Sequence, residues 1–159
     1  MPRGGKGAPK RYIAPDPIYG SVLLAKFINS VMEDGKKTIA QSNVYKAMDI
    51  LKEKGMDPIQ TFEKAIDTIA PKMEVRPKRV GGAAYQVPQE VRGPRRISLS
   101  IRWLLEAARN KSNSEFHTFA EKLAAEIISA VNNEGEAIKK RDNVLRMAEA
   151  NKAFAHFRF

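Results

Sequence analysis

The chain has 159 residues and no cysteine, which excludes disulfides, thiolate metal sites and thiol nucleophiles. Hydrophobic residues make up 43% of it, enough for one folded domain, and no apolar run approaches the roughly 20 residues that a membrane-spanning helix needs. The net charge of +10 favours a polyanionic partner over a membrane or a small-molecule substrate.

The excess positive charge is concentrated in three segments, residues 1–11, 72–96 and 139–159. Together they hold more than the whole net charge, so the rest of the chain is slightly acidic. Such clustering of arginine and lysine is typical of nucleic-acid binding. Residues 1–15 have neither apolar periodicity nor the apolar stretch of a secretory signal. We therefore expect a flexible basic arm over residues 1–15, a helical RNA-binding domain over residues 16–159 and a cytoplasmic location.

Apolar residues at helical spacing predict three helices in the first part of this domain, over residues 21–34, 38–54 and 58–70. The third has the clearest start. Asp57 is a favoured cap residue, and Pro58 suits the first helical position.

The period then changes to two residues, which predicts a β-hairpin over residues 72–91 with a tight turn at Gly81-Gly82. Its outgoing strand would extend roughly 30 Å, about twice the radius of a domain of this size. We therefore expect the hairpin to protrude, with its base packed on the helices through Met73, Val75 and Val87 and its tip free for a partner.

Three further helices are predicted after the hairpin. Gly93 and Pro94 begin the fourth, on which Arg95, Arg102 and Arg109 lie seven residues apart and therefore share one stripe.

Ser112 with Glu115 predicts a capping box for the fifth helix, which would include His117. The sixth begins near Glu136 and leads into an aromatic tail at residues 154–159. The predicted fold class is mainly α: a six-helix single domain with a protruding two-stranded β-hairpin between helices three and four and a basic N-terminal arm.

Residues typical of catalysis are sparse. His117 and His156 are expected in different elements, and a surface or packing role is the ordinary interpretation of each. Residues 4–7 imitate part of a phosphate-binding loop, but no strand precedes them. We expect no enzymatic activity, no catalytic residue, no metal and no cofactor.

Five sequence blocks, in this order and over nearly the whole chain, resemble the family of bacterial ribosomal small-subunit protein seven. They are Asp16–Ser21, Gly35–Lys37, Arg76–Gly82, Ile101–Arg109 and Arg146–His156. This resemblance implies the same architecture, six helices with a hairpin arm, that the periodicities predict.

The resemblance also implies a function. Members of this family are structural constituents of the small ribosomal subunit that bind the 3′ major domain of its RNA and nucleate assembly of the head. They lie at the subunit interface beside the exit-site tRNA and the mRNA path, and they contact small-subunit proteins nine and eleven. The chain departs from the family at Asn43, where an apolar residue is usual.

Each contact between a basic side chain and a phosphate adds affinity but does not distinguish one nucleobase from another. We therefore expect arginines and lysines, held at fixed distances by rigid helices, to recognise the shape of folded RNA. The candidate rRNA-binding residues are Arg3, Lys6, Lys10, Arg11, Lys36, Lys37, Lys72, Arg76, Arg92, Arg95, Arg96, Arg102, Arg109, Lys139, Arg141 and Arg146. The candidate residues of the hairpin that face tRNA or mRNA are Lys78, Arg79, Gly81, Gly82 and Tyr85.

Structural alternatives remain for these groups. The arginine stripe could be an exposed face paired with Glu106, the hairpin bases a solubilising edge, and Lys36 with Lys37 a solvated loop. The tail aromatics could stack on bases or pack on the core.

Two other classes of protein fit the sequence less well. A DNA-binding regulator would concentrate its charge on one recognition helix, whereas three separate segments carry it here. A membrane-surface protein would place tryptophan at the interface, whereas the single Trp103 lies within the predicted fourth helix.

Overall fold

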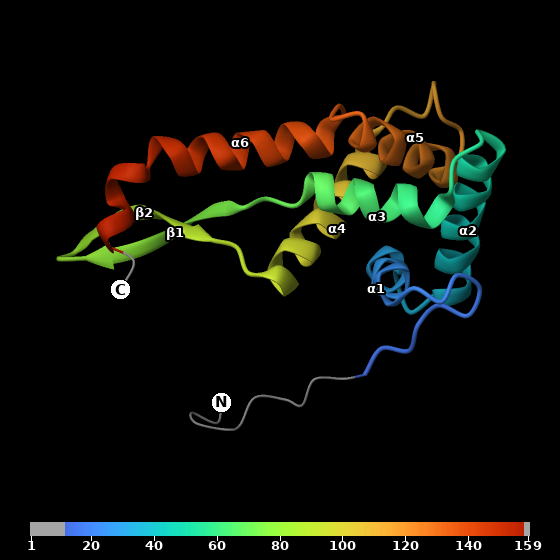
Figure 1. Cartoon of the computed structure of the whole chain (residues 1–159), viewed down its shortest axis with the longest axis horizontal. Coiled ribbons are helices and arrows are strands. Elements are labelled where there is room, and N and C mark those ends of the chain that lie inside the picture. The colour runs from blue at the N-terminus through green and yellow to red at the C-terminus, as the bar shows by residue number, and fades with distance from the viewer. Residues whose placement is uncertain (1–11, 158–159) are drawn as a thin grey trace.

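The computed structural model describes residues 12–157 and confirms the mainly helical fold with a hairpin between the third and fourth helices (Figure 1). In chain order the elements are α1 (Val22–Val31), α2 (Lys37–Glu53), α3 (Pro58–Ile69), β1 (Met73–Val80), β2 (Ala83–Glu90), α4 (Gly93–Asn110), α5 (Phe119–Val131), α6 (Glu136–Ala150) and a 3-10 helix, η1 (Lys152–Phe157).

Helix α5 organises the core, because it packs against α2, α3 and α4. Leu123 and Ile127 of α5 are completely buried. On the opposite side of the core the rings of Phe27 in α1 and Phe62 in α3 meet edge to face, with centroids 5.2 Å apart. The arginines of α4 therefore project from a helix whose inner face is held by the core.

The hairpin has the expected antiparallel register, with Val80 opposite Ala83 across a two-residue turn. Gly81 and Gly82 have φ of 57° and 87°. Both values lie in the left-handed region that this kind of hairpin turn requires and that glycine adopts without strain.

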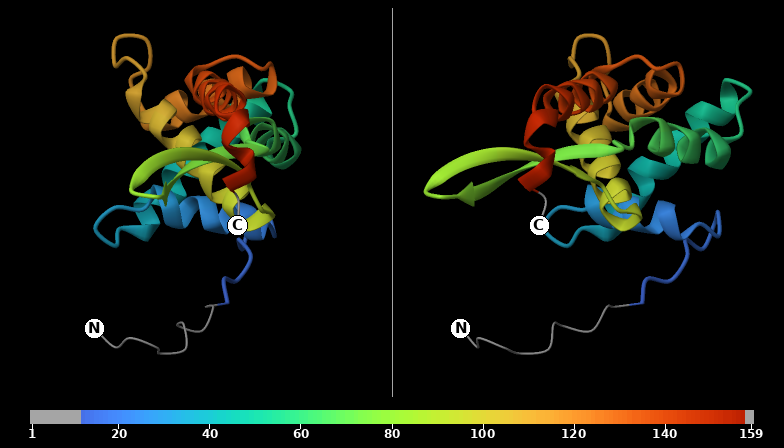
Figure 2. Two further views of the ribbon diagram at one scale, coloured as in Figure 1. Left: turned by 90° about the vertical axis from the view of Figure 1, so that its left-hand side faces the viewer. Right: turned by 60° about the vertical axis from the view of Figure 1, so that its left-hand side comes forward.

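We expected only the base of the hairpin to pack on the rest of the protein. In the structure, packing covers a greater length of the hairpin. Helix α6 runs beside both strands, and η1 folds back onto β2 (Figure 1). The ring of Tyr85 lies 5.3 Å from that of Phe154 and 5.1 Å from that of Phe157. Packing therefore continues up to Tyr85, and the end of the hairpin that carries the turn extends beyond η1 (Figure 2).

The start of the fifth helix was predicted wrongly. Helix α5 begins at Phe119, with Thr118 as its cap, and His117 precedes the helix. The Thr118 hydroxyl accepts a hydrogen bond from the Glu121 backbone, and the Glu121 carboxylate accepts one from the Thr118 backbone, which completes the capping box.

The sequence holds two overlapping cap patterns, and only the second directly precedes a run of residues that the core buries. Ser112, in the predicted box, instead shares a hydrogen bond with Ser114 within the α4–α5 loop.

Candidate nucleic-acid interface

The N-terminus of α4 gathers arginines and has no acidic residue in its first turn. Arg92 is the cap residue and caps no backbone group with its side chain, and Arg95 and Arg96 follow within the first turn. Nε of Arg96 is buried and has no hydrogen-bond partner within residues 12–157. A helix N-terminus is itself partially positive, so this cluster favours a bound anion such as phosphate.

A buried carboxylate joins this helix to the hairpin. Glu74 of β1 is 7% exposed, and its Oε1 accepts hydrogen bonds from Nε of Arg76 at 2.8 Å and Nε of Arg95 at 2.7 Å. The side chains of Arg76 and Arg95 are about half exposed, at 49% and 50%. Glu74 therefore holds both arginines at one carboxylate while about half of each side chain stays exposed.

The ionisation of Glu74 reflects these contacts. Burial alone would raise the pKa of Glu74, but hydrogen bonds from Arg95 and Arg76 outweigh it and lower the pKa. The same contact raises the pKa of Arg95. All three groups are therefore charged at neutral pH, and the cluster keeps an excess of one positive charge.

The predicted arginine stripe lies along the exposed face of α4, with Arg95, Arg102 and Arg109 all exposed. Arg109 pairs with Glu33, whose Oε1 lies 2.5 Å from its Nη2. Arg102 makes no ion pair or hydrogen bond within the described residues. Glu106, considered above as a partner for the stripe, pairs with Lys140 of α6 instead.

Two of the three candidate basic residues of α6 make ion pairs or hydrogen bonds within the protein. Lys139 pairs with Glu136 one turn earlier. Arg141 donates from Nη1 to the carbonyl oxygen of Thr68 at 2.7 Å and pairs with Asp142, so it caps the C-terminal end of α3. Arg146 is exposed.

Three further candidate rRNA-binding residues lie outside α4 and α6, at the start of α2 and at the root of the hairpin. Lys36 and Lys37 are exposed at the start of α2, and Lys36 lies 3.7 Å from Asp34. Lys72 is exposed at the root of the hairpin, beside an open apolar pocket of about 590 Å³ under α6.

Within the hairpin, Arg79 and the two turn glycines are exposed, Lys78 is half-buried opposite Tyr85, and Tyr85 is half-buried against the tail. Arg3, Lys6, Lys10 and Arg11 lie outside the described residues.

Sequence reasoning missed the buried charges that set these elements in place. Glu126 of α5 is completely buried, accepts a hydrogen bond from the backbone N–H of Ala137 at 3.1 Å and pairs with Lys111 at 2.9 Å. It therefore caps α6, whose cap residue Gly135 has no side chain to do so. A signal was present, since Glu126 interrupts the apolar pattern next to Ile127.

Glu74 could also have been suspected, because it lies two residues before Arg76 and so on the same face of a strand. Its second partner, Arg95, is 21 residues away in the sequence, and local patterns do not predict such a contact.

Within residues 12–157, no group of three or more histidine or acidic side chains is placed to hold a metal ion. The same part of the chain contains no helix with the length and apolar character needed to cross a bilayer.

Fold and charge together define a small, basic, mainly helical protein that presents arginines along one helix and at the root of a hairpin. Residues 3–152 match the family model described as Ribosomal protein S7p/S5e. The chain is 57% identical over 160 residues to small ribosomal subunit protein uS7 of Caldanaerobacter subterraneus subsp. tengcongensis, with 100% of both chains covered.

It is 59% identical over 153 residues to the protein of that name from Thermotoga neapolitana, covering 96% of this chain and 97% of the relative. Against the one from Thermoanaerobacter sp. it is 54% identical over 160 residues, with 100% of both covered. The chain belongs to the ribosomal protein S7p/S5e family, whose members are structural, non-enzymatic constituents of the ribosome. The expected location in the ribosome agrees with this membership.

Proposed function

We propose that this protein binds small-subunit ribosomal RNA directly, in its 3′ major domain, and nucleates assembly of the head of the subunit. The observation that carries the proposal is the N-terminus of α4, where Arg92, Arg95 and Arg96 follow closely in a first turn that holds no acid and where Nε of Arg96 is buried without a hydrogen-bond partner in the described residues. Glu74 of the hairpin offsets one of these three charges. Such a site is stabilised by an anion, and RNA supplies phosphates at regular spacing.

The stripe on α4 extends this contact. Arg95, Arg102 and Arg109 are separated by two helical turns each, roughly 10 Å along the axis. In this proposal Arg95 and Arg102 contact phosphates along one RNA backbone, while Arg76 contacts a second segment from the hairpin. Arg109, at the far end of the stripe, pairs with Glu33 and is not a phosphate contact in this proposal. Recognition then depends on the shape of an RNA junction, because α4 and Glu74 fix the positions of the arginine side chains.

The turn of the hairpin has a different role in this proposal. It extends beyond the part that α6 and η1 cover, so it can reach a second ligand while the helices hold rRNA (Figure 2). The family resemblance suggests that this ligand is the exit-site tRNA or the mRNA, and that the side chains of Lys78 and Arg79 contact it. Small-subunit proteins nine and eleven are the proposed protein neighbours.

A binding comparison tests the RNA proposal. The full-length protein is titrated against a transcript of the 3′ major domain and against duplex DNA of equal length at physiological salt. We expect much tighter binding to the transcript, because the protein's arginines and lysines are arranged to fit a folded RNA surface. Equal affinities would reduce the interaction to nonspecific attraction of a basic protein to a polyanion.

A further inference from the structure

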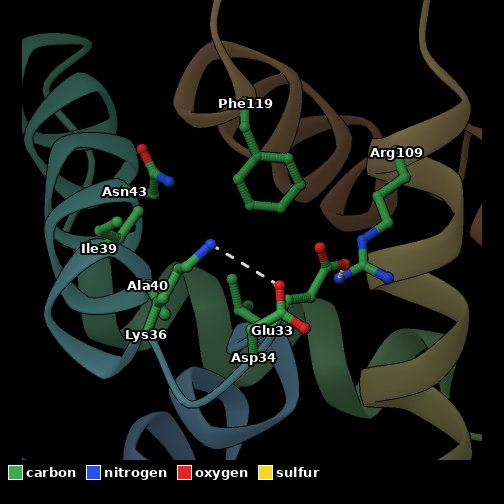
Figure 3. A pocket seen from close by; sticks show the side chains of 9 residues that line it. Glu33, Asp34, Lys36, Ile39, Ala40, Asn43, Arg109 and Phe119 are labelled. Carbon is green, nitrogen blue, oxygen red and sulfur yellow. Dashed lines mark ion pairs between the residues drawn. The ribbon is translucent and has the colours of Figure 1, made fainter.

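A pocket of about 370 Å³ opens between the start of α2, the end of α4 and the start of α5 (Figure 3). Phe119, the first residue of α5, turns its ring toward the pocket, and Ile39 and Asn43 lie on the opposite wall (Figure 3). Ile39 is 58% exposed, and Phe119 is half-buried. The pocket therefore offers an aromatic ring on one wall and an aliphatic side chain on the other to a ligand.

The charges around the pocket cancel one another. Arg109 pairs with Glu33, and Lys36 lies 3.7 Å from Asp34, so two positive and two negative groups line the same opening. A phosphate would meet both carboxylates there. The pocket therefore fits a neutral ligand better than an anion, in contrast to the N-terminus of α4.

Asn43 supplies the hydrogen-bonding group. Its amide lines the pocket, is half-buried and makes no hydrogen bond within residues 12–157. An amide offers two donors and an acceptor, the same groups that line the edges of nucleobases.

We propose that this pocket holds one unpaired base of the bound RNA, stacked against the ring of Phe119 with its edge hydrogen-bonded to Asn43. The proposal rests on the proposed RNA-binding function and adds a base-recognising site to contacts that otherwise recognise phosphates. Bases extruded from loops and bulges are recognised in this way, by an aromatic face and a polar side chain at the edge.

The test combines two substitutions with base-resolved probing. Full-length protein carrying Phe119→Leu or Asn43→Ala is bound to the 3′ major-domain transcript, and the Watson–Crick edges of unpaired bases are probed chemically. Asn143→Ala is the matched control, because Asn143 is an exposed asparagine beside a different pocket on α6. Thermal unfolding of each variant shows whether it is folded.

For Phe119→Leu we expect binding to weaken roughly 5- to 100-fold, the range of one lost base stack, with the salt dependence unchanged because no phosphate contact is removed. Phe119→Leu and Asn43→Ala should lose protection at the same nucleotide, and Asn143→Ala should keep it. If Phe119→Leu does not fold, the protection pattern of Asn43→Ala decides.

Wild-type protection and affinity in both variants would overturn the base pocket and leave a protein neighbour as its occupant. A changed salt slope without a single deprotected nucleotide would also overturn it. Failure of the wild-type protein to prefer the transcript over DNA would instead refute the underlying function, so the two outcomes are distinguishable.

Discussion

Glu74 connects the hairpin to α4 through Arg95 and also holds Arg76 of its own strand, and this makes it the residue whose charge most affects the interface. Its folded-state pKa is lowered, so ionised Glu74 stabilises the protein fully above the pKa of the unfolded chain, near 4.5. That contribution is lost as the pH falls through the lower folded-state pKa.

The substitution Glu74→Gln should therefore lower the free energy of unfolding at pH 7 by about 1.5 to 3 kcal/mol, the range for hydrogen bonds to a charged group. Urea unfolding at pH 7 and at pH 3 measures the change. The difference from the wild type should shrink at pH 3. Glu90→Gln, an exposed carboxylate on the same hairpin, is the control and should have little effect at either pH. A difference of equal size at both values of pH would show that Glu74 does not act through its charge.

Arg102 is the clearest test of phosphate contact on α4, because it is exposed and makes no ion pair within residues 12–157. The substitution Arg102→Gln keeps helix propensity nearly unchanged. If Arg102 contacts one phosphate, the slope of log affinity against log salt should become shallower by roughly 0.7 to 0.9, with thermal stability unchanged.

Arg95 is less suitable, since its removal would also free Glu74. Lys54→Gln, at an exposed position beyond the proposed interface, is the control and should leave the slope alone. An unchanged slope for Arg102→Gln would mean that this part of α4 faces solvent or protein.

At the scale of elements, the start of α6 depends on a close approach between two helices. Gly135 has φ of 94°, and a Cβ added there would lie 2.7 Å from Oε1 of Glu126, the buried carboxylate that caps α6. Glu126 cannot move away easily, because Lys111 holds its other oxygen.

The substitution Gly135→Ala should therefore destabilise the protein by about 2 kcal/mol or more, from backbone strain together with the displaced carboxylate. Chemical denaturation measures it. Gly55→Ala is a matched control, since Gly55 also has a positive φ, of 76°, but no atom within 4 Å of an added Cβ. Equal losses for the two variants would show that strain alone accounts for the effect.

The hairpin consists of a covered part and an uncovered turn, and these can be separated. Lys78 pairs with Tyr85, whose ring contacts the tail, so residues 79–84 can be replaced by Asn-Gly without disturbing that contact. We expect unchanged thermal stability and normal incorporation into the subunit. If the turn reaches tRNA or mRNA, reading-frame maintenance in a reporter assay should change. Wild-type frame maintenance would count against that role.

At the scale of the whole molecule, the tail and the hairpin stabilise one another. Phe154 and Phe157 lie with their rings 6.4 Å apart and both contact Tyr85, so η1 packs on a segment about 70 residues earlier. An isolated two-stranded hairpin is marginal in water, and this packing extends its support toward the turn. Phe154 and Phe157 therefore pack on the hairpin and not on the buried core, which is neither of the two possibilities that the sequence left open. Phe159 lies outside the described residues.

The sequence by itself determined the six α-helices of the described residues, the hairpin with its turn at Gly81-Gly82 and the clustering of positive charge. These features depend on local periodicity and composition, which the chain carries wherever its elements pack. The sequence did not predict the 3-10 helix η1. Local patterns did not determine the start of α5. The sequence holds two possible capping boxes, and the helix begins after Thr118 because the residues that follow Thr118 are buried in the core.

Only the tertiary structure placed Glu74 against Arg95, Glu126 at the start of α6, and Asn43 and Phe119 on the walls of one pocket. Each of these contacts joins segments that are distant in the sequence, and each depends on the packing of whole helices. A carboxylate in a strand or an amide on a helix looks the same in the sequence whether it faces solvent or a partner, and packing alone distinguishes the two.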